Sequence, residues 1–241
     1  MTDLIFRKAN LHIHTPASLC YNDKSVTPEQ IVNAALAGGL DVIAITDHNT
    51  FDAVENIRDI AQKKGLCVFP GIELSTKGGH FTALFEIDST LNELIATLEL
   101  LQPERNSWGD GTAILEGNTE EIIKQIALRG GIAIAAHIER WPSGFLESGE
   151  TSRVKMNIHA SPYLSALEIT IPQDRISWNN GKMLNYPKKY ACIQGSDAHN
   201  LDEIGRRPVY IKMESCNLEA LKSAFQDYED RIAFPDDISK E

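Results

Sequence analysis

Six of the seven histidines in this 241-residue chain stand at or just beyond short apolar runs that are typical of β-strands. Acidic residues occupy equivalent points at Asp47, Glu73 and Asp197. Zinc, manganese and iron accept imidazole and carboxylate ligands together, whereas calcium sites use oxygen alone. The pattern therefore predicts a site for divalent metal ions. The histidines concerned are His12, His14, His48, His80, His137 and His199.

The spacing within two pairs indicates how such residues could share an ion. In a strand, residues i and i+2 point to the same face, so His12 and His14 can reach one ion while Ile13 faces the opposite side. The same alternation aligns Asp197 with His199. A single pair of this kind is common, but five separate segments seldom place such groups at strand ends by chance.

The elements that must position these groups alternate along the chain. Strands are expected at residues 9–14, 41–46, 66–70, 80–86, 132–136, 166–170, 190–193 and 209–213, and helices at 28–37, 51–64, 91–101, 119–129 and 218–228. Thr27, Pro28 and Gln30 form a helix-start signal with a capping box, and Asn118 with Glu121 indicates a second cap. The alternation predicts an α/β fold with a parallel sheet. Because no GxGxxG follows the first strand, a closed barrel is favoured, whose strand ends converge at one face.

Length and composition set further bounds. The chain is expected to be one domain, residues 1–241, with long loops at 102–118 and 141–153 and a frayed tail at 235–241. Its four cysteines are far apart, so disulfides are not implied and a reducing cytoplasm fits best. No stretch approaches the roughly 20 apolar residues that span a bilayer. A net charge of −11 without a basic tract argues against an extended nucleic-acid footprint, but not against a short, locally bound end.

Six motifs then carry a family resemblance. LHIHT, AITDHNT, PGIEL, GGHFTAL, AAHIER and GSDAH follow in this order over residues 9–205 and resemble the PHP (polymerase and histidinol phosphatase) superfamily of metallophosphoesterases. The resemblance implies a distorted (β/α)7 TIM-like barrel, two or three zinc, manganese or iron ions at the C-terminal ends of the strands, and phosphoester hydrolysis. Residues 195–213 are similar to PHP domains that precede AAA- or SMC-type ATPases, which implies a partner ATPase, because this chain has no GxxxxGK[ST] motif of its own.

The resemblance also assigns nine ligands to three metal sites. Glu73 would bridge the first two sites, and Asp23 is assigned by its place four residues before the helix start at Thr27. The loop at 16–22 that precedes Asp23 is longer than in related sequences. The first site would comprise His12, His14, Glu73 and Asp197, the second Glu73, His80 and His137, and the third Asp23, His48 and His199.

Arginines near these motifs are candidates for substrate binding. Arg140, three residues after His137, is the expected phosphate ligand, because a guanidinium matches the fork of phosphate oxygens. A surface ion pair with Glu139 or Glu147 is the alternative for Arg140. The weaker candidates on the same rim are Arg206 and Arg207.

The expected mechanism is attack on phosphorus by a hydroxide formed between two ions, with Arg140 stabilising the developing charge. Glu73 and Asp197 complete the catalytic set by holding the ions, and His199 is a candidate acid for the leaving oxygen. Asp47 is expected behind the ligands, where it would fix an imidazole tautomer, or else cap the helix at Phe51. His159, the seventh histidine, is interpreted as structural.

The substrate stays open at this level. A small phosphomonoester or nucleotide fits the acidic chain, and an exonuclease that acts on nucleic-acid ends with a partner ATPase is the next alternative. Two rivals lie outside phosphoester chemistry. One is an amidohydrolase-type metal hydrolase, and the other is a non-catalytic, metal-stabilised regulatory module.

Overall fold

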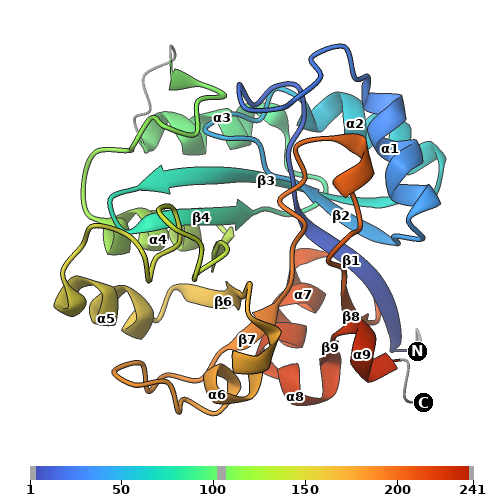
Figure 1. Cartoon of the computed structure of the whole chain (residues 1–241). Coiled ribbons are helices and arrows are strands. Elements are labelled where there is room, and N and C mark those ends of the chain that lie inside the picture. The colour runs from blue at the N-terminus through green and yellow to red at the C-terminus, as the bar shows by residue number, and fades with distance from the viewer. Residues whose placement is uncertain (1–3, 102–106, 239–241) are drawn as a thin grey trace.

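The computed structural model describes residues 4–101 and 107–238, in which strands and helices largely alternate (Figure 1). In the first half the order is β1 (Ile5–Ile13), α1 (Pro28–Ala37), β2 (Val42–Ile45), α2 (Val54–Lys63), β3 (Cys67–Thr76), β4 (Gly79–Leu84), α3 (Leu91–Leu100) and α4 (Thr119–Leu128). In the second half it is β5 (Ile132–Ala135), α5 (Ser152–Ala160), β6 (Leu164–Glu168), η2 (Pro172–Asp174), α6 (Arg175–Asn179), β7 (Ala191–Ile193), η3 (Leu201–Glu203), β8 (Val209–Met213), α7 (Leu218–Gln226), α8 (Tyr228–Arg231), β9 (Ile232–Ala233) and α9 (Pro235–Ile238).

The strands form one curled sheet in the order β7-β6-β5-β4-β3-β2-β1-β8-β9. Strands β1 to β3 are parallel, and so are β5 to β7, whereas β4 runs antiparallel to both of its neighbours. Strands β8 and β9 extend the sheet beyond β1 with antiparallel pairs. The expected α/β barrel is therefore confirmed, although the β3–β4 hairpin interrupts a regular (β/α)7 succession in the described chain.

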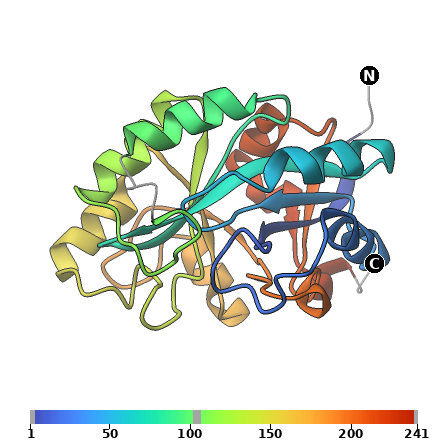
Figure 2. The same ribbon diagram turned by 90° about the horizontal axis from the view of Figure 1, so that it is seen from above.

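The segment that follows β7 is hydrogen-bonded to the C-terminal end of β1. The backbone N–H of Asp197 donates to the carbonyl of His12 (3.1 Å), and that of His14 donates to the carbonyl of Ala198 (3.0 Å). The segment 195–198, which follows β7, thus lies along the end of β1 and nearly closes the ring. Figure 2 shows helices placed around the outside of these strands.

Apolar strands form the inner layer of the fold. Every residue of β2 (VIAI) and of β5 (IAIA) is buried, as expected of parallel strands that are covered on both faces. Helix α1 contributes Ile31, Val32 and Ala35 to the same core. These strands hold their C-terminal ends, and the residues that follow, in fixed positions.

Both predicted helix caps are present. The Thr27 hydroxyl accepts from the amide of Gln30, whose side chain bonds back to the amide of Thr27. The Asn118 side chain accepts from the amides of Glu120 and Glu121. A helix cap of this kind is worth about 1 kcal/mol, so the two caps fix helix starts that the barrel then positions.

Three segments differ from expectation or lie partly outside the described residues. Of the loop expected at 102–118, residues 102–106 lie outside the described residues. The loop expected at 141–153 gives way to helix α5 at Ser152. Residues 235–238, expected as a frayed tail, form the short helix α9, and 239–241 lie outside the described residues.

The structure also contains a disulfide that the sequence did not indicate. Cys67, at the start of β3, is bonded to Cys216, in the loop after β8, with their Cα atoms 6.5 Å apart. The two residues are 149 positions apart in sequence, so only the fold shows that they meet. Cys20 and Cys192 carry free thiols. No helix within the described ranges is both long and apolar enough to cross a membrane.

Candidate metal centre

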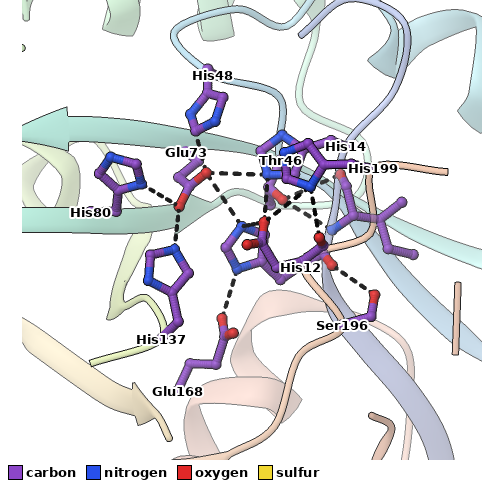
Figure 3. A network of polar contacts seen from close by, with 12 residues as sticks. His12, His14, Thr46, His48, Glu73, His80, His137, Glu168, Ser196 and His199 are labelled. Atoms are coloured by element: carbon purple, nitrogen blue, oxygen red, sulfur yellow. Dashed lines mark hydrogen bonds and ion pairs between the residues drawn. The ribbon is translucent and has the colours of Figure 1, made fainter. Parts of the chain in front are cut away.

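Eight of the nine side chains predicted as metal ligands meet where the strands end. Figure 3 labels all of these except Asp197. The backbone explains the convergence, because neighbouring strands of the barrel place their ends side by side. Strands β1, β3 and β4 carry three of the residues themselves, and short loops after β1, β2, β5 and β7 carry the others. The eight are His12, His14, His48, Glu73, His80, His137, Asp197 and His199.

Glu73 stands at the centre of this group, with 1% of its surface exposed. Its Oε1 lies 3.0 Å from His80 Nδ1 and 3.0 Å from His137 Nε2. Its Oε2 lies 3.4 Å from His12 Nε2, 3.2 Å from His14 Nε2 and 3.1 Å from His48 Nδ1. The two carboxylate oxygens thus face two different sets of imidazoles, which is the arrangement that a carboxylate shared by two cations requires.

Asp197 completes the set on the side of the Glu73 Oε2 atom. Its Oδ1 lies 2.9 Å from His14 Nε2 and 3.3 Å from His12 Nε2. Two imidazole nitrogens and two carboxylate oxygens therefore converge at one point, as the His-x-His spacing predicts. This mixture of nitrogen and oxygen ligands suits zinc, manganese or iron, whereas calcium is bound by oxygen ligands alone.

Several polar atoms in this group are buried without a hydrogen bond in the described residues. They include His12 Nε2, His48 Nδ1 and Glu73 Oε2. Leaving such an atom unsatisfied costs about 1–3 kcal/mol, and more for a charged group. Divalent cations between these atoms would satisfy them, so the residues present fit the metal ions that the sequence implies.

Burial and charge act against each other on the buried imidazoles. Burial disfavours the protonated form of His12, but the carboxylates of Glu168 and Glu73 outweigh burial and raise the His12 pKa well above its usual value. At His48 burial prevails and lowers the pKa to about 3. Burial also opposes charge on Asp197, but His12 and His14 hold the pKa of that carboxyl well below its ordinary value. The cluster therefore keeps its carboxylates ionised.

Two of the residues sit on strained backbone. His137 has φ of 28° and Asp197 has φ of 49°, in the left-handed region that non-glycine residues seldom adopt. Such conformations cost about 1–3 kcal/mol each and persist only where the surroundings impose them. Gly195 also needs its small size, because a Cβ there would lie 2.8 Å from the Cβ of His12. The backbone is thus bent to aim these side chains inward.

A second layer of carboxylates orients the imidazoles. His12 Nδ1 lies 2.7 Å from Glu168 Oε2, a buried contact that the sequence analysis missed. An acidic residue inside the apolar run of β6 was the signal that could have revealed Glu168. Asp47 accepts hydrogen bonds from Thr15 and from the Ser18 hydroxyl (2.6 Å), and that hydroxyl lies 3.0 Å from His14 Nδ1. Asp47 therefore reaches an imidazole through Ser18 rather than directly.

The centre opens into a cavity of about 420 Å³. Arg140 lines this cavity with 41% of its side chain exposed and pairs with Asp197, not with Glu139. Glu139 accepts from the amide and the hydroxyl of Thr170 instead. Ser143 and the loop at 110–112 also line the cavity.

The two weaker arginine candidates do not line this cavity. Arg206 bonds to the carbonyl of Asp202. Arg207 donates to the carbonyls of Ile169 and Thr170. Backbone carbonyls thus hold both guanidinium groups away from the centre. A larger hollow of about 990 Å³ lies between α6 and α9, and none of the strand-end histidines is among the described residues that line it.

Asp23 is the predicted ligand that the structure does not bring to the centre. It is exposed, and its carboxylate accepts from the amide (2.9 Å) and the hydroxyl (2.7 Å) of Ser25. The loop at 16–22 presents Cys20 instead, with its Sγ 3.1 Å from His199 Nε2. The extra length of this loop moves Asp23 past the site.

A barrel with this set of imidazoles and carboxylates at one end defines the class of metal-dependent hydrolases. Within that class, the chain belongs to the PHP domain family, whose sequence model matches residues 10–160. The match covers five of the six motifs on which the resemblance rests, from LHIHT to AAHIER.

Individual relatives extend this result. A Methanocaldococcus jannaschii protein described as uncharacterized is 34% identical over 137 residues, which span 54% of this chain and 67% of the relative. A 5'-3' exoribonuclease of Haemophilus influenzae is 31% identical over 97 residues, 39% of this chain and 34% of the enzyme. Endonuclease Q of Pyrococcus furiosus has the same fold, with a TM-score of 0.71 and 18% identity over 94% of this chain and 57% of that one. This chain thus spans only a part of each relative.

Proposed function

We propose that this protein hydrolyses phosphoesters with two or three divalent ions held by the strand-end cluster. The observation that carries the proposal is that the two carboxylate oxygens of Glu73 face different imidazoles. Oε1 faces His80 and His137, whereas Oε2 faces His12 and His14. The first site would comprise His12, His14, Glu73 and Asp197, and the second Glu73, His80 and His137. Bound divalent ions would lower the pKa of a water molecule and polarise the phosphoryl oxygens.

The protein's own groups then have separate tasks. Arg140, at the mouth of the cavity, would release Asp197 and hold the non-bridging phosphoryl oxygens in a bidentate contact. His199 lines the same cavity and is partly exposed, so with only the first two sites filled it can supply a proton to the leaving oxygen. Glu168 and the Asp47–Ser18 pair would keep the rings of His12 and His14 in one orientation.

Removal of the ions tests the proposal. Treatment with a chelator should abolish hydrolysis of p-nitrophenyl phosphate or of its bis-ester, and Mn²⁺, Zn²⁺ or Fe²⁺ should restore it. Full activity in a metal-free preparation would refute the proposal. Amide hydrolysis without phosphoester hydrolysis would favour the amidohydrolase alternative, and metal binding without any turnover would favour a regulatory module.

The substitution Arg140→Ala separates substrate binding from metal binding. We expect activity to fall by about 10- to 1000-fold, in line with the loss of a group that stabilises the transition state, while metal content stays unchanged. Arg206→Ala is the matched control, because Arg206 is an exposed arginine outside the cavity. Loss of metal in Arg140→Ala would show that Arg140 supports the centre instead.

A second candidate substrate is the end of a nucleic acid. The exoribonuclease relative motivates it, and so does Trp141, which is 78% exposed and adjoins Arg140. Indole faces stack on bases, with about 1–3 kcal/mol for each stacked base. The net charge of −11 favours a short contact over a long track along the phosphate backbone. This proposal also includes a partner ATPase that supplies further contacts to the nucleic acid. The Cys67–Cys216 disulfide removes the ground on which a reducing cytoplasm was expected.

A substrate panel distinguishes the two candidates. If nucleic-acid ends are the substrate, single-stranded oligonucleotides should be cleaved faster than free nucleotides. Trp141→Ala should then raise KM for oligonucleotides about 5- to 100-fold while Trp141→Phe retains most binding. Equal effects of Trp141→Ala on oligonucleotides and on p-nitrophenyl phosphate would argue against stacking.

A further inference from the structure

The loop at 15–22 is fixed against the candidate metal centre by its backbone. The amide of Ser18 donates to the Thr15 carbonyl (3.0 Å), and that of Asn22 donates to the carbonyl of His199 (3.0 Å). The amide of Leu19 donates to the Gly109 carbonyl (2.7 Å). The loop therefore has contacts on both sides of Cys20, and the thiol has a defined place.

Cys20 shares that place with histidines of the centre. Its Sγ lies 3.1 Å from His199 Nε2. One potential ligand atom from each of His14, Cys20, His48 and His199 lies within 4.8 Å of the others. His48 is 5% exposed, and its Nδ1 has no hydrogen-bond partner in the described chain. His48 Nδ1 also lies 3.1 Å from Glu73 Oε2, so this buried imidazole stands between the Glu73 carboxylate and the Cys20 thiol. Together with His199, these side chains form a set of donors that can hold a cation.

Neighbouring contacts distinguish His14 from Cys20 and His199, although all three lie near His48. The Nε2 of His14 already faces Asp197 and Glu73, and its Nδ1 lies 3.0 Å from the Ser18 hydroxyl. His14 therefore belongs with the first site. Cys20 also lines the cavity and is exposed, so an ion at this edge can exchange with solvent.

We propose that Cys20, His48 and His199 form a third, thiolate-containing metal position, in which Cys20 takes the role that the sequence assigned to Asp23. This inference rests on the proposed metal-dependent function of the centre. On binding, the thiol gives up its proton to solvent and its sulfur forms a bond to the divalent ion, without any change of oxidation state. A thiolate ligand favours zinc, cobalt and iron over manganese and magnesium, so the third position would differ in metal preference from the two carboxylate-bridged sites.

A thiolate at this position also has a chemical consequence. A peroxide can oxidise an exposed thiol to a sulfenic acid, and a small disulfide can exchange with it to give a mixed disulfide and a released thiol. Neither product offers a free thiolate. Oxidation of Cys20 would therefore remove the ion from the third position and leave the other two sites complete. The side chains of Cys67 and Cys216 cannot take part, because they are already joined to each other.

Replacement of the native ions by Co²⁺ tests the proposal with a spectroscopic readout. A cobalt–thiolate bond gives a sulfur-to-metal charge-transfer absorption in the near ultraviolet, which imidazole and carboxylate ligands do not give. We expect wild-type protein to bind three equivalents of Co²⁺ at saturation and to show this band. Cys20→Ser should lose the band and one equivalent of metal. Asp23→Asn is the matched control and should keep both.

Alkylation supplies a second measurement that does not depend on colour. Saturating Zn²⁺ should slow the reaction of Cys20 with iodoacetamide at least about 10-fold in wild-type protein and in Asp23→Asn. A band that persists in Cys20→Ser, or unchanged alkylation with Zn²⁺, would overturn the proposal. Two equivalents of Co²⁺ without a thiolate band would reject only the third position, whereas no bound metal in wild-type protein would reject the proposed function as well.

Discussion

Two histidines of this protein are almost equally buried but have opposite surroundings. His12 is 0% exposed and His159 is 1% exposed. Burial opposes protonation of both, but Glu168 and Glu73 outweigh it at His12 and raise the pKa well above its usual value. At His159, burial and the charge of Lys188 lower the pKa to about 4. Burial alone therefore does not decide the chemistry of an imidazole in this fold; the nearby charges do.

The two environments have different partners. Rings of Trp178, Tyr186 and Tyr190 lie 5.8, 5.1 and 5.0 Å from the ring of His159, measured between centroids. His12 instead has carboxylate oxygens of three acidic residues within 3.4 Å. An aromatic cage stabilises a neutral imidazole by packing, which fits the structural interpretation of His159. A ring of carboxylates stabilises a cation, and a divalent metal ion is a better occupant than a shared proton.

The largest expected loss of activity comes from substitution of Glu73, which contacts more imidazoles than any other carboxylate among the described residues. Glu73→Gln removes a charge from the point where five imidazoles meet. We expect activity to fall more than about 100-fold, beyond the 10- to 100-fold typical of residues behind the ligands. Elemental analysis should show the loss of at least one ion. Wild-type metal content in Glu73→Gln would contradict the bridging role.

A smaller effect should follow from Glu168→Gln. The amide retains a hydrogen bond to His12 but removes the negative charge that holds the ring. We expect a 10- to 100-fold loss in metal affinity, measured by titration with Zn²⁺ against a competing chelator. Glu139→Gln is a suitable control, because Glu139 bonds to Thr170 outside the cluster. Equal losses in the two variants would show a general effect of charge rather than support of His12.

The aromatic environment predicts a pH dependence of stability. The folded-state pKa of His159 is about 4, whereas an unfolded chain has about 6.5, so the unfolded state binds more protons between these values. The contribution of His159 to the free energy of unfolding should therefore fall as the pH drops from 6.5 towards 4. This contribution should not change with pH below 4 or above 6.5. The slope is at most about 1.4 kcal/mol for each pH unit.

The variant His159→Phe isolates this contribution. Denaturant unfolding of metal-free wild type and variant should give free energies of unfolding whose difference changes across pH 6.5 to 4. Other groups titrate equally in both proteins and cancel from the difference. A difference that does not change with pH would mean that His159 is protonated in its aromatic cage.

Strong local patterns predicted most of the fold. Strand β8 and helix α1 have the expected bounds, because a bounded apolar run and a capping box are local signals. Strand β9 has two residues and helix α5 has a weakly patterned, polar sequence, so both depend on packing that a sequence does not display. The reversal of β4 depends on the turn at Lys77 and Gly78, and an apolar run does not reveal its own direction.

The candidate centre was predicted to a similar extent. Residues at strand ends converged as expected, because the fold alone brings them together. Asp23 was expected near His199, but Cys20 lies there instead. The path of the loop at 16–22 decides which side chain faces His199, and sequence spacing does not show that path. Glu168 was missed because a single acid in a strand has many ordinary explanations, and only the barrel places it behind His12.

The segment 195–198 connects the candidate metal centre with the closure of the barrel. Its hydrogen bonds join the end of β1 at His12 and His14, and Asp197 lies in the same segment. The segment that completes the ring thus carries Asp197, one of the proposed metal ligands. An ion that binds only the joined form would stabilise that form. We therefore expect removal of the ions to loosen the barrel first where this segment meets β1.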